Sequence, residues 1–119
     1  MLAATDSHEL AWAAGFVDGE GTFRARKQTY RGRAYYYLQF CVTHKHPELI
    51  ERVDRLLAGK TYHYPQRESG HSSESKFIAN SREAFEVANL LWPWLGEQKK
   101  ADFKRALGKV LESRRRVMQ

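Results

Sequence analysis

Two carboxylates that close an apolar segment are the residues of this chain best placed to do chemistry. Residues 10–17 are apolar, and Asp18 and Glu20 follow them, interleaved with glycines. This pattern predicts a helix that begins after Asp6 and ends at about Val17 or Asp18. Negative charge at the carboxyl end of a helix opposes the helix dipole, so acids in this place favour a bound cation. A capped turn with no ligand is the simpler alternative.

The predicted helix also carries a stripe of small residues. Ala11, Gly15 and Gly19 are four positions apart and therefore share one face of the helix. A face without bulk lets the backbone of a second helix approach closely. At the start of the helix, Asp6 and Glu9 resemble a capping box, with Asp6 as the N-cap.

Residues 13–21 read Ala-Ala-Gly-Phe-Val-Asp-Gly-Glu-Gly. This stretch resembles the signature of the LAGLIDADG homing endonucleases. The residues that match are Ala14, Gly15, Asp18 and Gly21, and Phe16 and Val17 are conservative apolar replacements. Three positions depart from the signature: Ala13 replaces a leucine, Gly19 an alanine and Glu20 the second aspartate. The length and element order of the rest of the chain are also similar to that family, except for the last few residues.

Composition is consistent with a small domain that binds a polyanion. The chain has 119 residues, 42% of them hydrophobic, which predicts a single domain over 1–119, with 1–5 loose and 114–119 a basic tail. A net charge of +6 favours nucleic acid as the partner, although solubility alone is the alternative. The single cysteine, Cys41, excludes an internal disulfide. With no membrane span expected, the predicted location is the cytoplasm, or an organelle matrix if the gene is organellar.

Two strands are predicted after the helix, at about Thr22–Tyr30 and Arg33–Thr43, with a turn at Arg31-Gly32. Residues 21–47 contain six basic residues and no acid. Alternation places arginine, glutamine, tyrosine and threonine on one sheet face, which suits contact with base edges in a DNA major groove. An ordinary solvated face is the alternative. The residues predicted to contact DNA are Arg24, Arg26, Gln28, Arg31, Arg33, Tyr35, Tyr37 and Gln39, with Tyr62, Tyr64, Gln66 and Lys76 extending the face.

The rest of the chain predicts helices around a second strand pair. A helix opens at Pro47 and stops at Gly59, and strands follow at about 60–67 and 76–79. Asn80 or Ser81 is expected to cap a third helix that ends at Pro93 and buries Phe85. The last helix is expected over about 97–113, with Phe103, Leu107, Val110 and Leu111 inward and Arg114–Arg116 as a frayed tail.

The family resemblance implies an α+β fold of the αββαββα type. Its four-stranded antiparallel sheet forms a saddle for DNA, and the helices pack behind it. The chain has one copy of the signature, which implies a homodimer and a near-palindromic DNA site. The predicted dimer contacts are Ala11, Gly15, Asp18 and Gly19.

The resemblance also implies site-specific hydrolysis of double-stranded DNA with Mg²⁺, or another divalent cation such as Mn²⁺. Glu20 is the implied metal ligand, with the Gly19 carbonyl as a second ligand and Asp18 as a structural residue. His44 corresponds to a polar residue that holds water, unless it is only a histidine beside a helix start. Lys99 is the first choice, before Lys100, for the base near the cleaved phosphate; a solvated lysine is the alternative.

Two other functions remain open at this stage. One is a protein of the same fold that binds without cutting, such as an RNA-splicing maturase or a transcription factor. Glu20 argues against it, because a pure binder has little need for that acid. The other is a basic scaffold that uses its sheet for RNA. Neither reading involves a small-molecule substrate, and the sequence does not distinguish an intron, intein or free-standing origin.

Overall fold

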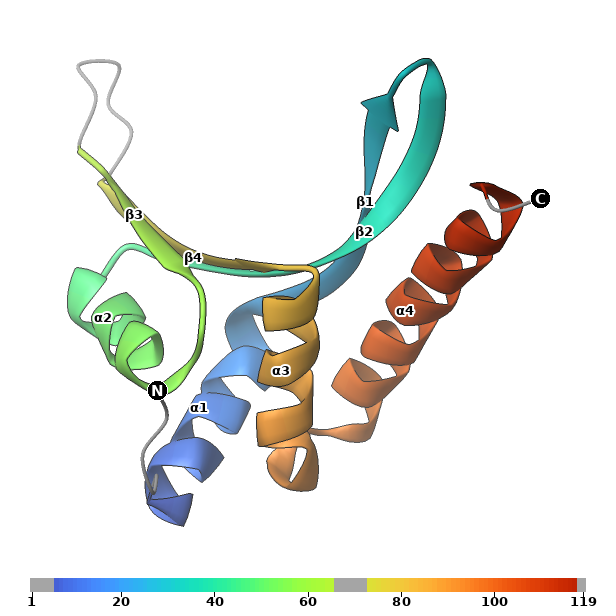
Figure 1. The fold of residues 1–119 in the computed structure, drawn as a ribbon. Helices are drawn as coiled ribbons and strands as arrows, with labels where there is room; N and C mark the ends of the chain where they lie inside the picture. The colour runs from blue at the N-terminus through green and yellow to red at the C-terminus, as the bar shows by residue number, and fades with distance from the viewer. Residues whose placement is uncertain (1–5, 66–72, 118–119) are drawn as a thin grey trace.

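The computed structural model describes residues 6–65 and 73–117. Helices and strands alternate in the predicted order, and Figure 1 shows their arrangement. The elements are α1 (Ser7–Glu20), β1 (Gly21–Tyr30), β2 (Arg33–His44), α2 (Pro47–Leu56), β3 (Lys60–Tyr64), β4 (Glu74–Asn80), α3 (Arg82–Leu91), the short 3₁₀ helix η1 (Trp92–Trp94) and α4 (Glu97–Val117).

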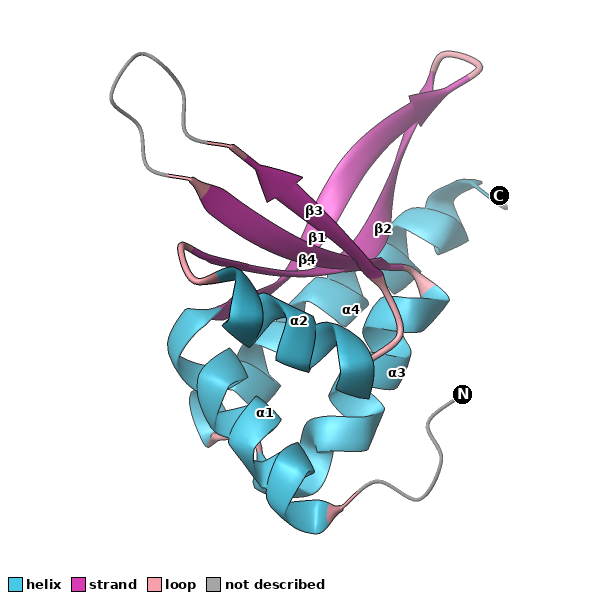
Figure 2. Cartoon of the chain, turned by 90° about the vertical axis from the view of Figure 1, so that its left-hand side faces the viewer, coloured by secondary structure: helices cyan, strands magenta, loops and turns pink. Residues whose placement is uncertain are grey.

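The four strands form one antiparallel sheet in the order β1-β2-β4-β3. The sheet curves into a saddle, and the helices lie against its convex side (Figure 1). Turned by 90°, the molecule shows the same two layers, with strands above and helices below (Figure 2). The α+β saddle expected from the sequence is confirmed.

The hairpin between β1 and β2 depends on its two turn residues. Arg31 has φ 51° and Gly32 has φ 77°. Positive φ at both central positions is the geometry of a type I′ turn, whose twist matches that of paired strands. The turn fixes the register, so Arg24 lies opposite Gln39 and Gly21 opposite Val42.

A single apolar core lies between the sheet and the helices. Phe40 and Phe77 from the sheet, Val17 from α1, Ile50 from α2 and Leu91 from α3 are fully buried. Aromatic rings connect the layers: Phe103 of α4 meets Phe23 of β1 edge-on, with ring centroids 5.4 Å apart. This core holds the sheet rigidly on its helical support.

Helix α1 is longer than the sequence predicts. It continues through Gly19 to Glu20 and passes directly into β1 at Gly21. Gly19 does not break the helix because its φ is not positive, so the helical path simply continues. The expected N-cap is confirmed, since Asp6 accepts a hydrogen bond from the His8 N–H at 2.8 Å. Glu9 does not complete a capping box, because its carboxylate is bound by Arg52 of α2.

The predicted end of the second helix needs correction, and that of the third does not. Helix α2 ends at Leu56, before Gly59. Gly59 is instead a point of close approach: a Cβ there would clash with the Phe77 ring and lie 2.7 Å from the Ile78 carbonyl oxygen. The predicted end of the third helix holds to within two residues: α3 ends at Leu91, and Pro93 lies in the following 3₁₀ helix η1.

The predicted inward positions of the last two helices are also partly wrong. Phe85 and Leu111 are 47% and 52% exposed, because smaller residues such as Ala84 and Ala106 face the core in their place. The basic segment 114–116 is the last turn of α4 and not a frayed tail. Arg116 pairs with Glu112 at 2.7 Å, and cations at this end complement the helix dipole.

Within the described residues, no helix is long and apolar enough to span a lipid bilayer.

Candidate functional site

The carboxyl end of α1 brings together the two acids singled out from the sequence, and their surroundings differ. Both oxygens of Asp18 accept a hydrogen bond from the Gly96 N–H, each at 3.1 Å. Gly96 directly precedes α4, so the carboxylate lies at the positive end of that helix, where negative charge is favourable. Asp18 therefore ties α1 to α4, as the structural reading of this residue expects.

Glu20 has no such partner. Its side chain is exposed, and no described residue forms an ion pair or a side-chain hydrogen bond with it. The described residues also contain no cluster of three or more His, Cys, Asp or Glu able to hold a metal ion. Because Glu20 lies in the last turn of α1, its charge is not offset by the helix dipole. Among the described residues, Glu20 is therefore an uncompensated carboxylate at the corner where α1 meets β1.

One lysine of α4 approaches the same corner. Lys99 Nζ donates a hydrogen bond to the Gly21 carbonyl oxygen at 2.6 Å, next to Glu20 in the chain. Lys100 points elsewhere: its Nζ lies 3.6 Å from Glu97 and 5.4 Å from the centre of the Trp92 ring. The geometry therefore separates the two lysines that the sequence left ambiguous, because only Lys99 contacts the residue next to Glu20.

His44 is the last residue of β2, not the first residue after it. Its Nδ1 accepts a hydrogen bond from the His46 N–H at 3.0 Å, which leaves the proton of a neutral ring on Nε2. The ring lies 5.7 Å from the Phe16 ring of α1. Since Gly21 pairs with Val42, the end of β2 lies beside the end of α1. His44 is thus held near the corner by both of its neighbours.

The small-residue face of α1 is open. Gly15 and Gly19 are exposed, and a Cβ built on either would have no described atom within 4 Å apart from its chain neighbours and the backbone of its own helix. Ala11 on the same face is partly buried. Close packing inside this chain therefore does not account for the glycines.

The outward face of the sheet carries the residues predicted to contact DNA. Register pairs Arg26 with Tyr37 and Gln28 with Tyr35 across β1 and β2, and Tyr62 with Lys76 across β3 and β4. The predicted residues of the strands share this face, which is the concave side in Figure 1. Arg31 lies in the β1–β2 turn, and Gln66 lies outside the described residues.

The charge on this face is strongly one-sided. At the described outward positions of the four strands, Glu74 is the only acid, against Arg24, Arg26, Arg33, Lys60 and Lys76. Several tyrosines on this face are also exposed, among them Tyr30, Tyr62 and Tyr64. A curved basic face with aromatic and amide side chains suits a polyanionic duplex.

Gln39 differs from its neighbours on this face because it is only 5% exposed. Its Oε1 accepts hydrogen bonds from Arg24 Nε at 3.0 Å and Nη2 at 2.8 Å. Its Nε2 donates to Asn80 Oδ1 at 2.9 Å. These partners occupy the amide that the sequence assigned to DNA contact. The sequence predicts Asn80 or Ser81 as a helix cap, and Ser81 is the N-cap of α3. Asn80 instead lies on the face of Lys76, as strand alternation would place it.

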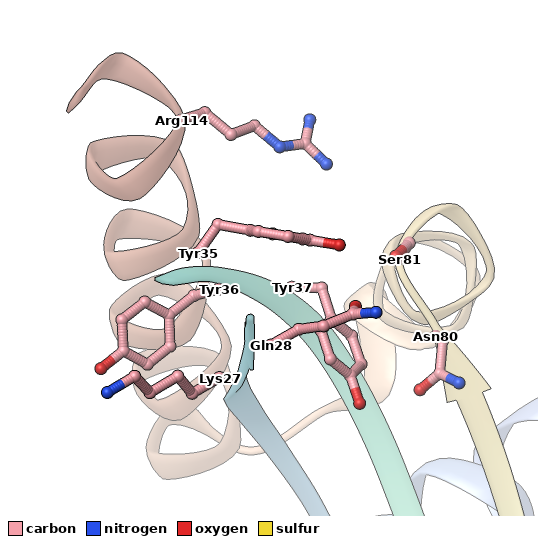
Figure 3. A pocket seen from close by; sticks show the side chains of 8 residues that line it. All are labelled: Lys27, Gln28, Tyr35, Tyr36, Tyr37, Asn80, Ser81 and Arg114. Atoms are coloured by element: carbon pink, nitrogen blue, oxygen red, sulfur yellow. The ribbon is translucent and has the colours of Figure 1, made fainter. Parts of the chain in front are cut away.

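An open hollow of about 600 Å³ lies beside Asn80. Figure 3 shows that Arg114 from α4 and Tyr35 from β2 extend in the same direction over it. The sequence does not predict a residue of α4 at this place. The hollow is lined by Lys27, Gln28, Tyr35, Tyr36, Tyr37, Asn80, Ser81 and Arg114, none of them acidic.

No protein-family profile and no curated protein matches this chain by sequence. Solved structures are nevertheless similar to it. An archaeal intron-encoded homing endonuclease, I-Vdi141I, in complex with DNA is 17% identical, with a TM-score of 0.61 over 76% of this chain and 57% of its own. The group I intron-encoded I-CeuI, also with DNA, is 18% identical, with a TM-score of 0.63 over 87% and 55%. The LAGLIDADG meganuclease I-CpaMI, bound to uncleaved DNA, is 26% identical, with a TM-score of 0.61 over 84% and 35%.

The match spans about a third to somewhat more than half of each of these solved chains. Their common feature is the fold, and the elements that match here form one sheet and its helices. The chain has the fold of the LAGLIDADG homing endonucleases, and the resemblance carried by residues 13–21 is confirmed at that level.

Proposed function

We propose that this chain is the subunit of a homodimeric endonuclease that cuts double-stranded DNA at a specific, near-palindromic site with the help of a divalent metal ion. One observation carries the proposal: the unpartnered carboxylate of Glu20 lies next in the chain to the Lys99 contact, at the start of the cation-rich sheet face. An exposed acid near a lysine suits phosphodiester hydrolysis, in which a carboxylate can hold a metal ion and an ammonium can stabilise charge on the phosphate.

Duplex DNA is the proposed substrate because the sheet is concave, basic and rich in amide and aromatic groups. The similar solved proteins are complexes with DNA, which supports the same partner for this chain. A β-ribbon of this width enters a major groove, where arginine and amide side chains reach the base edges.

A second copy of the chain is the proposed occupant of the open face of α1. Gly15 and Gly19 leave that face open, and the absence of side chains would let the backbone of another helix approach closely. Packing two such helices together would bring the two Glu20 carboxylates near a common axis, one for each DNA strand. The partly exposed Ala11 and the position of Asp18 beside that face are consistent with the same contact.

The residues of the corner fit a magnesium ion. Mg²⁺ takes hard oxygen ligands and keeps several waters, so one carboxylate, a main-chain oxygen such as that of Gly19 and phosphate oxygens are sufficient. A bound Mg²⁺ or Mn²⁺ activates water and neutralises charge on the phosphate. Glu20 would hold the ion, the Lys99 ammonium would stabilise charge on the phosphate, and His44 Nε2–H would orient water.

Cleavage of a randomised duplex library in Mg²⁺ tests the proposal, with the wild type beside Glu20→Gln. We expect the wild type to cut one enriched near-palindrome and Glu20→Gln to cut about 10²- to 10³-fold more slowly, the scale for losing one electrostatic group at a reacting centre. If neither protein cuts while both enrich one site, the nuclease assignment falls and a non-cutting DNA-binding protein takes its place. If duplex DNA is ignored and single-stranded RNA is bound, the RNA scaffold is the better reading.

Mobility of a host intron or intein is the biological role we propose for such cleavage, in the cytoplasm or an organelle matrix. Two of the similar solved proteins are named as intron-encoded, which supports this role. Light scattering of the protein alone and on its target tests the dimer separately: a monomer in both states would remove that part of the proposal.

A further inference from the structure

We infer that Arg24 reads a guanine in each half of the DNA target, and that Gln39 and Asn80 set its orientation. This inference rests on the proposed DNA-binding function and names one specific contact within it. It comes from a row of three side chains that crosses β1, β2 and β4 at the centre of the sheet. Arg24 lies directly opposite Gln39, and Gln39 directly opposite Asn80, so the row follows the strand register.

The row is held in place more firmly than the rest of the face. Gln39 is 5% exposed, and both ends of its amide are used. Asn80 ends β4, and the next residue, Ser81, turns the chain with φ 54° while its N–H donates to the Leu38 carbonyl at 2.7 Å. A positive φ at a non-glycine residue is strained and persists only where its surroundings enforce it. This turn therefore fixes where Asn80 stands.

The donors and acceptors of the row can be arranged in only one way. A guanidinium can donate but not accept, so Gln39 must present its oxygen to Arg24. The amide nitrogen of Gln39 then faces Asn80 and must meet an oxygen, which is Asn80 Oδ1. As a result, Asn80 Nδ2 is left without a partner among the described residues. The row thus presents hydrogen-bond donors at both of its ends.

The contacts of Arg24 leave the guanidinium edge that suits guanine available. Nε and one N–H of Nη2 are bound to Gln39, whereas Nη1 and the second N–H of Nη2 have no described partner. Arg24 also forms no ion pair with a described residue. Two parallel N–H groups on an arginine match O6 and N7 of guanine, the commonest specific contact in the major groove. Because Gln39 holds the side chain in advance, little side-chain freedom is lost on binding.

Asn80 Nδ2, the donor at the other end of the row, also favours particular bases. Asn80 Nδ2 favours a base with an acceptor in the major groove, such as O6 of guanine or O4 of thymine, and disfavours cytosine, which presents a donor there. The row therefore specifies two positions of the target, one at each of its ends. Its central residue, Gln39, is a positioning residue that needs no contact with DNA.

Selection of binding sites from a randomised duplex library, read by sequencing, tests the inference without requiring cleavage. The proteins compared are the wild type, Arg24→Lys, Gln39→Met and the control Arg26→Lys, which changes an exposed arginine of the same strand outside the row. Lysine keeps the charge but not the paired donors. Methionine keeps the volume of Gln39 but removes its oxygen. Thermal unfolding of each variant shows that it is folded.

We expect the wild type to prefer guanine at one position of each half-site, and Arg24→Lys and Gln39→Met to reduce that preference about tenfold or more while other positions keep theirs. Arg26→Lys should leave this position unchanged. If Arg24→Lys selects the same guanine as the wild type, or if Gln39→Met leaves it intact in a folded protein, the inference is wrong. If the wild type enriches no DNA site at all, the proposed function itself fails, which is a different result.

Reversing the direction of the row gives a second, independent test. In Gln39→Glu both side-chain oxygens accept, so Asn80 must turn its Nδ2 inward and present Oδ1 to the DNA. We expect the guanine at Arg24 to be kept and the preference beside Asn80 to move from guanine or thymine towards cytosine or adenine. Asn80→Asp should move it in the same direction. An unchanged preference beside Asn80 in both variants would overturn this part of the inference.

Discussion

The corner at the end of α1 and the concave face of the sheet are built in different ways. At the corner, side chains bind the main chain: Asp18 accepts from the Gly96 N–H, and Lys99 donates to the Gly21 carbonyl. On the sheet, side chains bind one another, as in the row from Arg24 to Asn80, or project freely. Main-chain anchors hold Asp18 and Lys99 in place independently of substitutions at nearby side chains. The side chains of the face can therefore be substituted while the corner stays in place.

The largest effect that separates the two regions is expected for Lys99. Lys99→Met should lower the rate of target cleavage about 10²- to 10³-fold, because an ammonium near the phosphate is lost, while the affinity for the target changes little. Lys100→Met is the matched control, since Lys100 is paired with Glu97 and lies against Trp92. Single-turnover cleavage of the selected target measures both. Equal losses in the two variants would contradict the assignment of Lys99 to the corner.

An intermediate effect is expected for an exposed cation of the sheet face. Arg26→Gln should weaken binding to all DNA sequences about equally and lower the slope of log K against log salt by about 0.9, because one phosphate contact is lost. The rate of cleavage of bound DNA should not change. Fluorescence anisotropy at several salt concentrations measures the slope. A selective loss at one base pair would show that Arg26 reads sequence instead.

A smaller effect distinguishes the two acids of the corner by stability. Asp18→Ala should lower the free energy of unfolding by about 1 kcal/mol, the usual cost of losing a helix cap. Glu20→Ala should leave the free energy of unfolding unchanged or raise it slightly, because the substitution removes a charge that opposes the helix dipole. Urea unfolding of the two variants at neutral pH gives both values. If Glu20→Ala proves the more destabilising change, the carboxylate has a structural partner after all.

The smallest effect concerns the base of α1, far from both regions. Hydrogen bonds from Arg52 hold the pKa of Glu9 below its ordinary value of 4.5. The pair therefore stabilises the fold above that value, and its contribution is lost as the pH falls through the lowered pKa. Thermal unfolding midpoints between pH 3 and pH 6 should fall more steeply for the wild type than for Glu9→Gln. Parallel curves would show that the pair does not contribute.

Features that depend on residues close together in the chain could be predicted from the sequence, whereas features that depend on contacts between distant segments could not. The signature, the strand alternation and the turn at Arg31-Gly32 are local, so the corner and the face of the sheet follow from them. The choice between Lys99 and Lys100 depends on how α4 packs against β1, which no local pattern contains. The row through Asn80 depends on the pairing of β2 with β4, two strands far apart in the chain. The exposure of Phe85 and Leu111 likewise reflects the angle at which the last helices meet the core.

The direct passage from α1 into β1 has a mechanical consequence. No residue separates Glu20 from the strand, and Gly21 is wedged between Phe40 and Val17, where a Cβ would lie 2.9 Å from the Phe40 ring. The junction between α1 and β1 is therefore rigid. Arg24 lies four residues further on, roughly 13 Å along an extended strand. The distance along the chain between Glu20 and the first side chains of the face is therefore fixed. Inserting one residue after Gly21 would turn every later side chain of β1 to the opposite face.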